Sequence, residues 1–186
     1  AAQLLFPITY IFGDIFTEVY GYAASRKAIW SGFFASALLT GVSMIVVALP
    51  PAPDWKLQRE YEIVLGFLPR LVVASLIAYW CGEFANSYVL AKMKVLTRGK
   101  HLWTRTIGST VVGQLVDSVL VMVIAFAGVM PWSLLLTSMI SGYVAKVAYE
   151  AAATPLTYLV VNAIKRAEGV DVLDEGTDFS PFKLSE

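Results

Sequence analysis

Acidic side chains stand inside stretches of this chain that are otherwise apolar, and they are the residues best suited to hold a polar ligand. Asp14 and Glu18 lie four residues apart, so a helix places both carboxylates on one face. Glu83 is followed by Asn86 and Ser87 at the same kind of spacing. An acid beside an amide and a hydroxyl can both accept and donate hydrogen bonds. These two segments therefore predict polar surfaces on helices.

Two later segments, IGSTVVGQLVDS and AKVAYEAAATPLTY, carry polar stripes of the same kind. In the first, hydroxyl, amide and carboxyl side chains recur at spacings of four and three, which place them on one helical face. In the second, a lysine and a glutamate are four residues apart, and Pro155 removes one helix hydrogen bond. The residues that we predict to bind a ligand are Asp14, Glu18, Glu83, Asn86, Ser109, Thr110, Gln114, Asp117, Lys146, Tyr149 and Glu150.

Each of these sets also has a purely structural explanation. For Asp14 and Glu18 the alternative is an ion pair with a distant cation. For the amide and hydroxyl that follow Glu83 it is hydrogen bonding between helices, a common role for such groups in membranes. Lys146 and Glu150 can pair with each other at their spacing of four. The sequence alone leaves these alternatives open.

The composition indicates that the polar residues lie in membrane-spanning helices. Hydrophobic residues make up 58% of the chain and charged residues 15%, and the mean hydropathy is +0.67, whereas a soluble domain has about a quarter charged residues. The apolar residues gather in blocks of about 20, the length that a helix needs to cross a bilayer. We predict an all-α, polytopic membrane bundle whose transmembrane domain, residues 1–166, contains five spans at about 3–24, 29–49, 63–91, 104–128 and 133–162.

The placement of Lys and Arg predicts the orientation, because cytoplasmic loops retain these residues. The basic segments are a short turn at residues 25–27, the connection at 92–105 and the residues that follow the last span. We therefore expect a cytoplasmic C-terminal tail, residues 167–186, and its weak hydrophobic pattern predicts that it packs loosely or is disordered. The same alternation places residue 1 outside, so we expect a further span before it and six in the full-length protein.

The residue content does not support several other classes of function. Acids and bases balance at 14 each, which gives no indication of a nucleic-acid partner. Cys81 is the only cysteine, which excludes an internal disulfide, and no Gly-rich phosphate loop, paired histidines or catalytic triad occurs. We expect neither an enzyme nor a bound metal or other cofactor. Acids outnumber bases within the spans, which suits a neutral or cationic ligand rich in N–H donors.

Three stretches of the chain resemble the queuosine precursor transporter family, also called the vitamin uptake transporter family. They are FPITYIFGDIFTEVYGYAASR, then GFLPRLVVASLIAYWCGEFANSYVLAKMKVLTRGKHLWTRTIGSTVVGQLVDS, and finally KVAYEAAATPLTYLVVNAIKRAEGVDV with the tail GTDFSPF. With the spacing between them, the resemblance covers nearly the whole chain. The one departure from the family's pattern is that its first span is absent from this sequence.

The resemblance implies a six-helix inner-membrane protein that imports 7-cyano-7-deazaguanine, 7-aminomethyl-7-deazaguanine or both, for later insertion into tRNA. It also implies a fold similar to the substrate-binding subunits of energy-coupling-factor transporters. On this basis Glu83 and Asp117 would accept the N–H groups of the guanine-like edge. Asn86 and Gln114 would address the carbonyl and remaining donors, and Asp14 or Glu18 would meet the aminomethyl cation.

Other functions stay open on the sequence alone. The chain could instead be the vitamin-binding subunit of an energy-coupling-factor transporter with another small-molecule cargo. It has no Walker motif, so a separate ATPase would then supply the energy. A membrane enzyme and a structural assembly factor are further alternatives. The partners that the resemblance implies are a small-molecule substrate and the lipid bilayer, and the sequence leaves open whether the protein associates with copies of itself.

Overall fold

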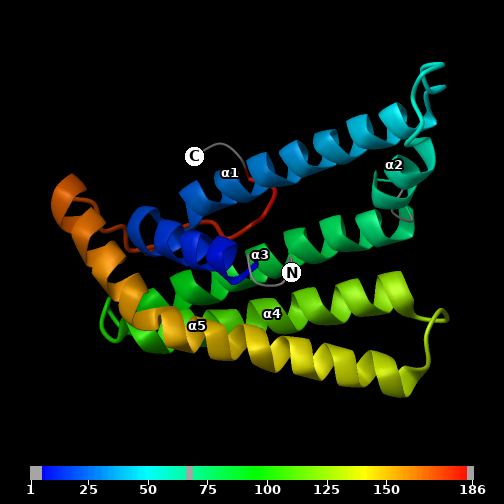
Figure 1. Ribbon diagram of the computed structural model, residues 1–186. Helices are drawn as coiled ribbons and strands as arrows, with labels where there is room; N and C mark the ends of the chain where they lie inside the picture. Colours follow the sequence, from blue (N-terminus) through cyan, green and yellow to red (C-terminus); the bar gives the residue numbers. More distant parts are fainter. Residues whose placement is uncertain (1–5, 66–68, 184–186) are drawn as a thin grey trace.

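The computed structural model describes residues 6–65 and 69–183, and every regular element in these ranges is a helix. This confirms the predicted all-α class. Residues 3–5 and 66–68 of the predicted spans lie outside the described residues. The helices are α1 (Phe6–Ala48), α2 (Gln58–Leu65), α3 (Pro69–Leu96), α4 (Leu102–Phe126) and α5 (Trp132–Glu168), arranged as a bundle with α3 and α4 side by side (Figure 1).

The first helix is broken at Gly21. This residue has φ 81° and ψ 174°, a backbone conformation that is open almost only to glycine. Figure 1 shows the chain turning back at this break, so that the second part of α1, residues 22–48, runs back in the opposite general direction to the first, residues 6–20. The predicted basic turn at residues 25–27 is wrong, because these residues are helical and the reversal occurs where the glycine permits it.

The C-terminal tail holds the two ends of this break. The Val172 N–H donates to the Val19 carbonyl at 3.0 Å, at the end of the first part of α1. The Tyr22 N–H donates to both carboxylate oxygens of Asp174 at 3.1 Å, at the start of the second part. Helix ends leave backbone groups without partners inside the helix. The tail therefore supplies caps on both sides of Gly21.

Farther along, the tail packs against α1 and α3. Arg26 donates to the carbonyls of Asp178 and Ser180 at 2.8 and 2.9 Å, and Trp30 donates to that of Pro181 at 2.8 Å. The ring of Phe179 lies 4.9 Å from that of Tyr22. The predicted loose packing of the tail is therefore wrong: its carbonyls and aromatic rings find partners on helices that lie far away in the sequence.

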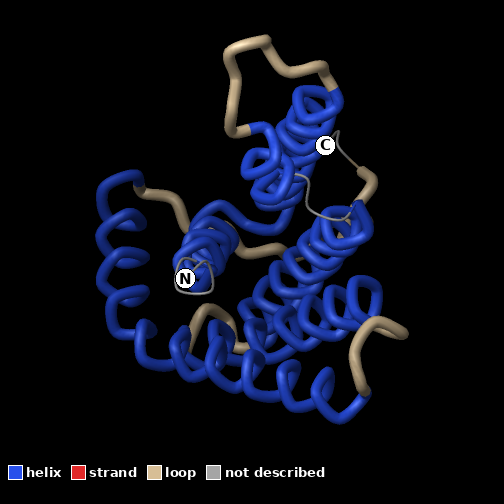
Figure 2. Tube along the Cα trace, turned by 45° about the vertical axis from the view of Figure 1, so that its right-hand side comes forward, coloured by secondary structure: helices blue, strands red, loops and turns tan. Residues whose placement is uncertain are grey.

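Glycines bring α3 and α4 close together. A Cβ added to Gly113 would lie 2.7 Å from the Asn86 Cβ, and one added to Gly82 would lie 2.9 Å from the Asp117 Cβ. Contacts this short are not tolerated, so only glycine allows the two backbones to approach at this point. The close crossing places the polar stripes of α3 and α4 against each other. Figure 2 shows the backbone of the helical bundle in a second view.

Two helical segments of the described residues, Thr9–Ala48 and Leu102–Phe126, are long and apolar enough to cross a membrane. The second part of α1 leaves large hydrophobic side chains such as Phe34, Leu38 and Leu39 exposed. The predicted span at 63–91 combined the end of α2 with most of α3. Pro69 begins α3, in line with the preference of proline for the first turn of a helix.

Replacing Gly21 with alanine is expected to destabilise the protein. The backbone strain alone amounts to about 1–3 kcal/mol, and the new Cβ would lie 2.7 Å from the Val172 side chain. Gly41→Ala is the matched control in the same helix, because nothing lies within 4 Å of its Cβ and alanine favours the helix by up to about 1 kcal/mol. Unfolding in detergent would measure the stability of both variants. Equal stability of the two variants would contradict a strained break at Gly21.

Candidate functional site

The Glu18 carboxylate is fully buried at the centre of a group of ions that joins four helices. Arg105 of α4 donates to both of its oxygens, at 2.6 and 2.7 Å. Lys165 of α5 lies 2.6 Å from Oε1, and Lys94 of α3 lies 3.7 Å from the same atom. A buried carboxylate is tolerated when opposite charges and hydrogen bonds replace its water. Glu18 thus ties the ends of α3, α4 and α5 to α1.

The tail completes this group through Asp171. Its Oδ1 lies 2.6 Å from the Lys94 ammonium and 2.8 Å from that of Lys165. Lys94 also donates to the backbone carbonyls of Glu18 and Val172. Burial favours the neutral acid, but hydrogen bonds from Lys165 and Lys94 outweigh it and hold the pKa of Asp171 below its ordinary value of 3.8. We define the ion cluster as Glu18, Lys94, Arg105, Lys165 and Asp171.

Asp14 lies in a different environment, although it is one helical turn from Glu18. It is fully buried, and its Oδ1 accepts a hydrogen bond of 2.5 Å from Nδ2 of Asn86 on α3. One turn nearer the break, the Thr17 hydroxyl lies 2.7 Å from that of Ser25 and 3.2 Å from that of Ser87. These contacts join both parts of α1 to α3, and none of them brings a cation to Asp14.

Asp117 and Lys146 form an ion pair between α4 and α5. The Lys146 ammonium lies 3.0 Å from Asp117 Oδ2, and both side chains are largely buried. The alternative pairing of Lys146 with Glu150 is not observed as a hydrogen bond, because both carboxylate oxygens of Glu150 lack a hydrogen-bond partner among the described residues. The spacing of four on one helix allowed that pairing, and the observed ion pair of the ammonium is with a carboxylate on the neighbouring helix.

Several buried oxygen atoms in the middle of the bundle have no hydrogen-bond partner within the described part of the chain. They are Asp14 Oδ2, Asn86 Oδ1, Thr110 Oγ1, Gln114 Oε1 and both carboxylate oxygens of Glu150, which we call the acceptor cluster. The amide of Asn86 donates through its nitrogen to Asp14, so its oxygen remains available as an acceptor. Because buried polar groups are normally hydrogen-bonded, this set of atoms favours a ligand rich in donors.

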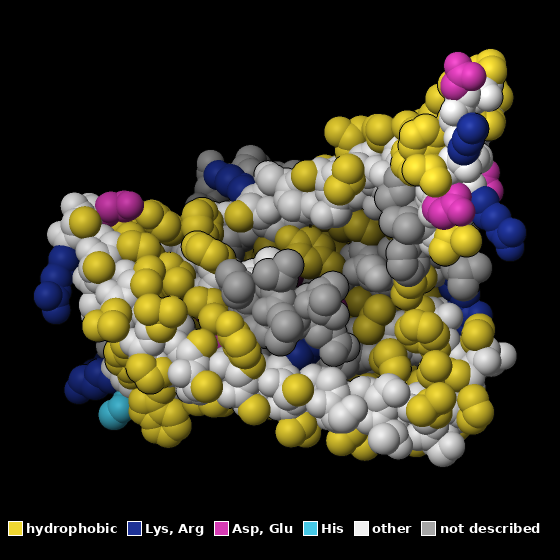
Figure 3. Space-filling view, in the orientation of Figure 1, with side chains coloured by type: hydrophobic (Ala, Val, Ile, Leu, Met, Phe, Trp, Pro, Cys, Tyr) yellow, Lys and Arg dark blue, Asp and Glu magenta, His cyan; other side chains and the backbone are white. Residues whose placement is uncertain are grey.

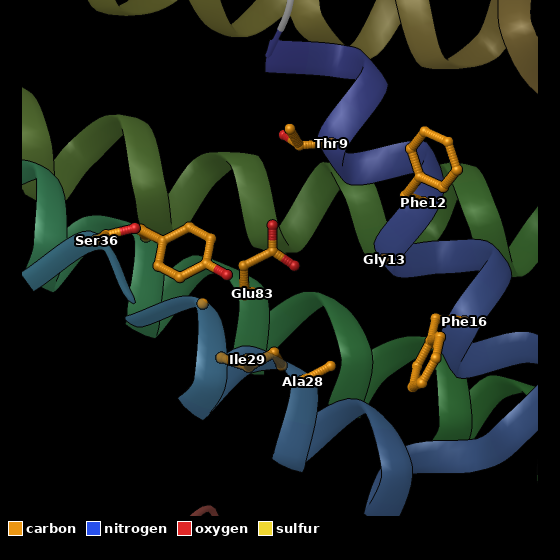
Figure 4. Close-up of a pocket in the computed structure, with 10 residues that line it drawn as sticks. Thr9, Phe12, Gly13, Phe16, Ala28, Ile29, Ser36 and Glu83 are labelled. Carbon is orange, nitrogen blue, oxygen red and sulfur yellow. The ribbon is translucent and has the colours of Figure 1, made fainter. Parts of the chain in front are cut away.

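A cavity of about 510 Å³ opens next to this cluster, between the two parts of α1 and α3. Figure 4 shows the Glu83 carboxylate projecting into it, with Thr9 and Phe12 on one side and Ser36 on the other. A Cβ on Gly13 would lie 3.1 Å from Glu83 Oε2, so the carboxylate closely approaches the backbone of α1. The cavity is lined by Thr9, Phe12, Gly13, Phe16, Ala28, Ile29, Gly32, Ser36, Tyr79 and Glu83.

On the face drawn in Figure 3, hydrophobic side chains are visible along the second part of α1 and along the helices below it. A site with apolar walls and a few convergent polar groups is typical of small-molecule binding. Within the described residues, no group of three or more His, Cys, Asp or Glu side chains is arranged to hold a metal ion.

Sequence reasoning missed two tyrosines that lie at the candidate site. Tyr10 is buried, and its hydroxyl is close enough to the carboxylates of Glu83, Asp117 and Asp14 to interact with them electrostatically. Tyr79 lines the cavity beside Glu83. Each tyrosine precedes a candidate acid by four residues, Tyr10 before Asp14 and Tyr79 before Glu83. The helical spacing that selected the acids was therefore a signal for these residues as well.

The structure divides the predicted site residues into two groups. Most of them meet in or beside the acceptor cluster and the cavity. Three do not: Glu18 is part of the ion cluster, the Ser109 hydroxyl donates to the Thr106 carbonyl at 3.0 Å, and Tyr149 is 40% exposed. The other eight are largely buried on α1, α3, α4 and α5, where Asn86 binds Asp14 and Lys146 binds Asp117; they are Asp14, Glu83, Asn86, Thr110, Gln114, Asp117, Lys146 and Glu150.

Comparison with known proteins gives two related matches. Residues 1–160 match a family model described as "Putative vitamin uptake transporter". A "Probable queuosine precursor transporter" from Bacillus subtilis (strain 168) is 34% identical over 156 residues, which are 83% of this chain and 68% of that protein. No solved structure matches the chain.

The ion cluster predicts a specific dependence of stability on pH. Because the folded protein holds the pKa of Asp171 below 3.8, ionised Asp171 stabilises the fold above that pH, and this contribution is lost as the pH falls through the lowered pKa. Asp171→Asn should therefore lower the melting temperature in detergent at about pH 7, with the difference from wild type shrinking in acid.

The exposed tail residue Glu175 provides the control, because it forms no ion pair in the described structure. Glu175→Gln should leave the melting temperature unchanged across the same pH series. A difference between Asp171→Asn and wild type that stayed constant down to about pH 3 would contradict the assigned role of the carboxylate.

Proposed function

The chain belongs to the vitamin uptake transporter family, and we propose that it carries a queuosine precursor, 7-cyano-7-deazaguanine or its aminomethyl relative, across the inner membrane. The observation that carries this proposal is the acceptor cluster. Its oxygen atoms need donors, and a deazaguanine presents a ring N–H, an exocyclic amine and a pyrrole N–H. The name of the relative from Bacillus subtilis supports the same cargo class.

Glu83 is our candidate for the guanine-like edge. Glu83 is 5% exposed and its carboxylate projects into the cavity, where two oxygens can accept the ring N–H and the exocyclic amine together. Charge-assisted hydrogen bonds of this kind are stronger than those between neutral groups. The rings of Phe12 and Phe16 on the cavity wall offer faces against which a flat heterocycle can stack.

We assign roles to the remaining candidate residues from the contacts that each of them makes. The free oxygens of Asn86 and Gln114 would accept the outer N–H groups of the cargo, and Asp14 would meet the aminomethyl cation. Asp117 is held by Lys146, so we assign it to shaping the site. Glu18 serves the ion cluster, and we propose no contact between it and the cargo.

The arrangement of the helix ends supports the predicted orientation. Lys94, Arg105 and Lys165 meet at the end of the bundle that holds the tail, and basic residues are retained on the cytoplasmic side. We therefore propose that this end and the tail are cytoplasmic, that the two parts of α1 span the membrane separately, and that α3, α4 and α5 provide the other spans.

Binding of both deazaguanines to the purified full-length protein in detergent tests this function. Wild-type protein should bind at least one of them saturably, and the cargo should be recovered unchanged. Glu83→Gln should weaken binding about 10- to 100-fold, because one charge-assisted hydrogen bond to the ligand contributes roughly 1.5–3 kcal/mol. Isothermal titration calorimetry provides the measurement.

Glu60→Gln is the control, since Glu60 is exposed on α2 and does not line the cavity. This variant should bind like wild type. Wild-type affinity in folded Glu83→Gln would remove Glu83 from the site. No binding by folded wild-type protein would contradict the proposed cargo, and copurification of an ATPase would then favour a vitamin-binding subunit with a different cargo.

A further inference from the structure

Two glycines of α1 allow polar side chains of α3 to approach the backbone of α1 at the cavity. A Cβ on Gly32, in the second part of α1, would lie 2.6 Å from the Tyr79 hydroxyl oxygen. A Cβ on Gly13, in the first part, would lie 3.1 Å from Glu83 Oε2. Gly13, Gly32, Tyr79 and Glu83 all line the cavity. Helix α3 thus presents two polar side chains to the cavity, one against each part of α1.

Tyr79 and Glu83 are placed to contact the same ligand. They lie four residues apart on one face of α3, and about 5–6 Å separates the Cβ atoms of such a pair. The three atoms nearest the added Cβ of Gly32 are the hydroxyl oxygen, Cζ and Cε1 of Tyr79, so the hydroxyl end of the ring points to the second part of α1. A flat molecule that reaches the Glu83 carboxylate therefore has the tyrosine hydroxyl beside it.

Gly32 is needed for the position of this hydroxyl rather than for the packing of helices. Added Cβ atoms at Gly82 and Gly113 would meet Cβ and backbone atoms of the neighbouring helix, which cannot move aside. At Gly32 the three nearest atoms all belong to the free end of one long side chain. A Cβ there would displace the tyrosine hydroxyl and leave the helices in place.

One polar group of the proposed cargo still has no assigned partner. This is the ring carbonyl, which lies next to the ring N–H that we assign to Glu83. The carbonyl needs a donor, and an ionised carboxylate can only accept. Among the described residues that line the cavity, Thr9, Ser36 and Tyr79 carry hydroxyl groups, which donate as well as accept and rotate to suit their partner. Of these three, Tyr79 alone lies on the same helix face as Glu83.

We infer that Tyr79 is a specificity-determining residue, whose hydroxyl donates to the ring carbonyl of the cargo while Glu83 accepts from the adjacent ring N–H. Gly32 is the positioning residue that makes room for this hydroxyl. The inference rests on the proposed function. The site then matches a heterocycle with an N–H beside a carbonyl. A heterocycle with an amino group in place of the carbonyl lacks that ring N–H and loses both hydrogen bonds.

Binding of 6-thio analogues isolates the carbonyl contact. The 6-thio analogue of either precursor keeps the ring N–H and the exocyclic amine, but its sulfur is a weak acceptor. The full-length wild-type protein in detergent should bind the oxo compound roughly 3- to 10-fold more tightly than the thio compound, as expected for one hydrogen bond. Tyr79→Phe should lose this preference because it weakens binding of the oxo compound alone. Isothermal titration calorimetry provides the affinities.

Gly32→Ala tests the positioning role. Its Cβ displaces the Tyr79 hydroxyl, so this variant should lose the same preference. In the Tyr79→Phe background the added Cβ would lie 3.6 Å from the ring Cζ, an ordinary contact, so the double variant should bind like Tyr79→Phe. Additive losses in the double variant would show that Gly32 acts independently of the hydroxyl and would overturn its positioning role.

Two matched controls come from the same helices. Tyr88 lies on α3 and Gly41 on the second part of α1, and neither lines the cavity. Tyr88→Phe and Gly41→Ala should keep the preference for the oxo compound. Loss of the preference in Ser36→Ala, with the preference kept in Tyr79→Phe, would assign the donor to α1 and overturn the inference.

The outcomes separate this inference from the proposed function. Equal affinity of wild type for the oxo and thio compounds, or equal weakening of both by Tyr79→Phe, would overturn the role of Tyr79 and leave the proposed function standing. Binding of neither precursor by folded wild-type protein would overturn both. If Tyr79→Phe does not fold, Gly32→Ala decides by the same comparison, because it keeps every other side chain.

Discussion

The buried charge of Glu18 is the constraint on which the arrangement of the helices depends. A carboxylate with no access to water must be surrounded by opposite charges, and those charges come from Lys94, Arg105 and Lys165 on three other helices. The ends of α1, α3, α4 and α5 are therefore held together by one group. The three bases exceed the two acids of the ion cluster, so the basic end of the bundle keeps a positive charge even though the lysines and the arginine are buried or paired.

The break in the first helix shapes the cavity of the candidate site. Gly21 allows α1 to reverse, and the tail caps both ends of the break through Val172 and Asp174. As a result, the first part of α1 lies beside its second part and α3, and the cavity that contains the Glu83 carboxylate lies between them. The tail is thus part of the structure that forms the cavity, although it lies more than a hundred residues away in the sequence.

Charge is distributed unevenly between the two ends of this arrangement. In the ion cluster both carboxylates are paired with cations, whereas the middle of the bundle contains four acids, Asp14, Glu83, Asp117 and Glu150, and a single described lysine, Lys146. An interior of this kind disfavours anions, because each would meet unbalanced negative charge in a region of low dielectric. It favours a flat, N–H-rich or cationic molecule, which can satisfy the free oxygens while its rings contact the aromatic cavity wall.

The sequence by itself determined the helical class, because apolar blocks and polar stripes at spacings of three and four are local properties of a helix. The same rule selected Asp14, Asn86 and Gln114, which the structure brings into the acceptor cluster. Only the tertiary structure decided which partner each charge takes. Glu18 and Asp14 look equivalent in the sequence, yet one meets Arg105 and the other meets Asn86, because their partners lie about seventy or more residues away. The reversal at Gly21 and the packing of the tail could not be predicted from the sequence for the same reason. Both depend on contacts between distant segments, which local periodicity does not encode.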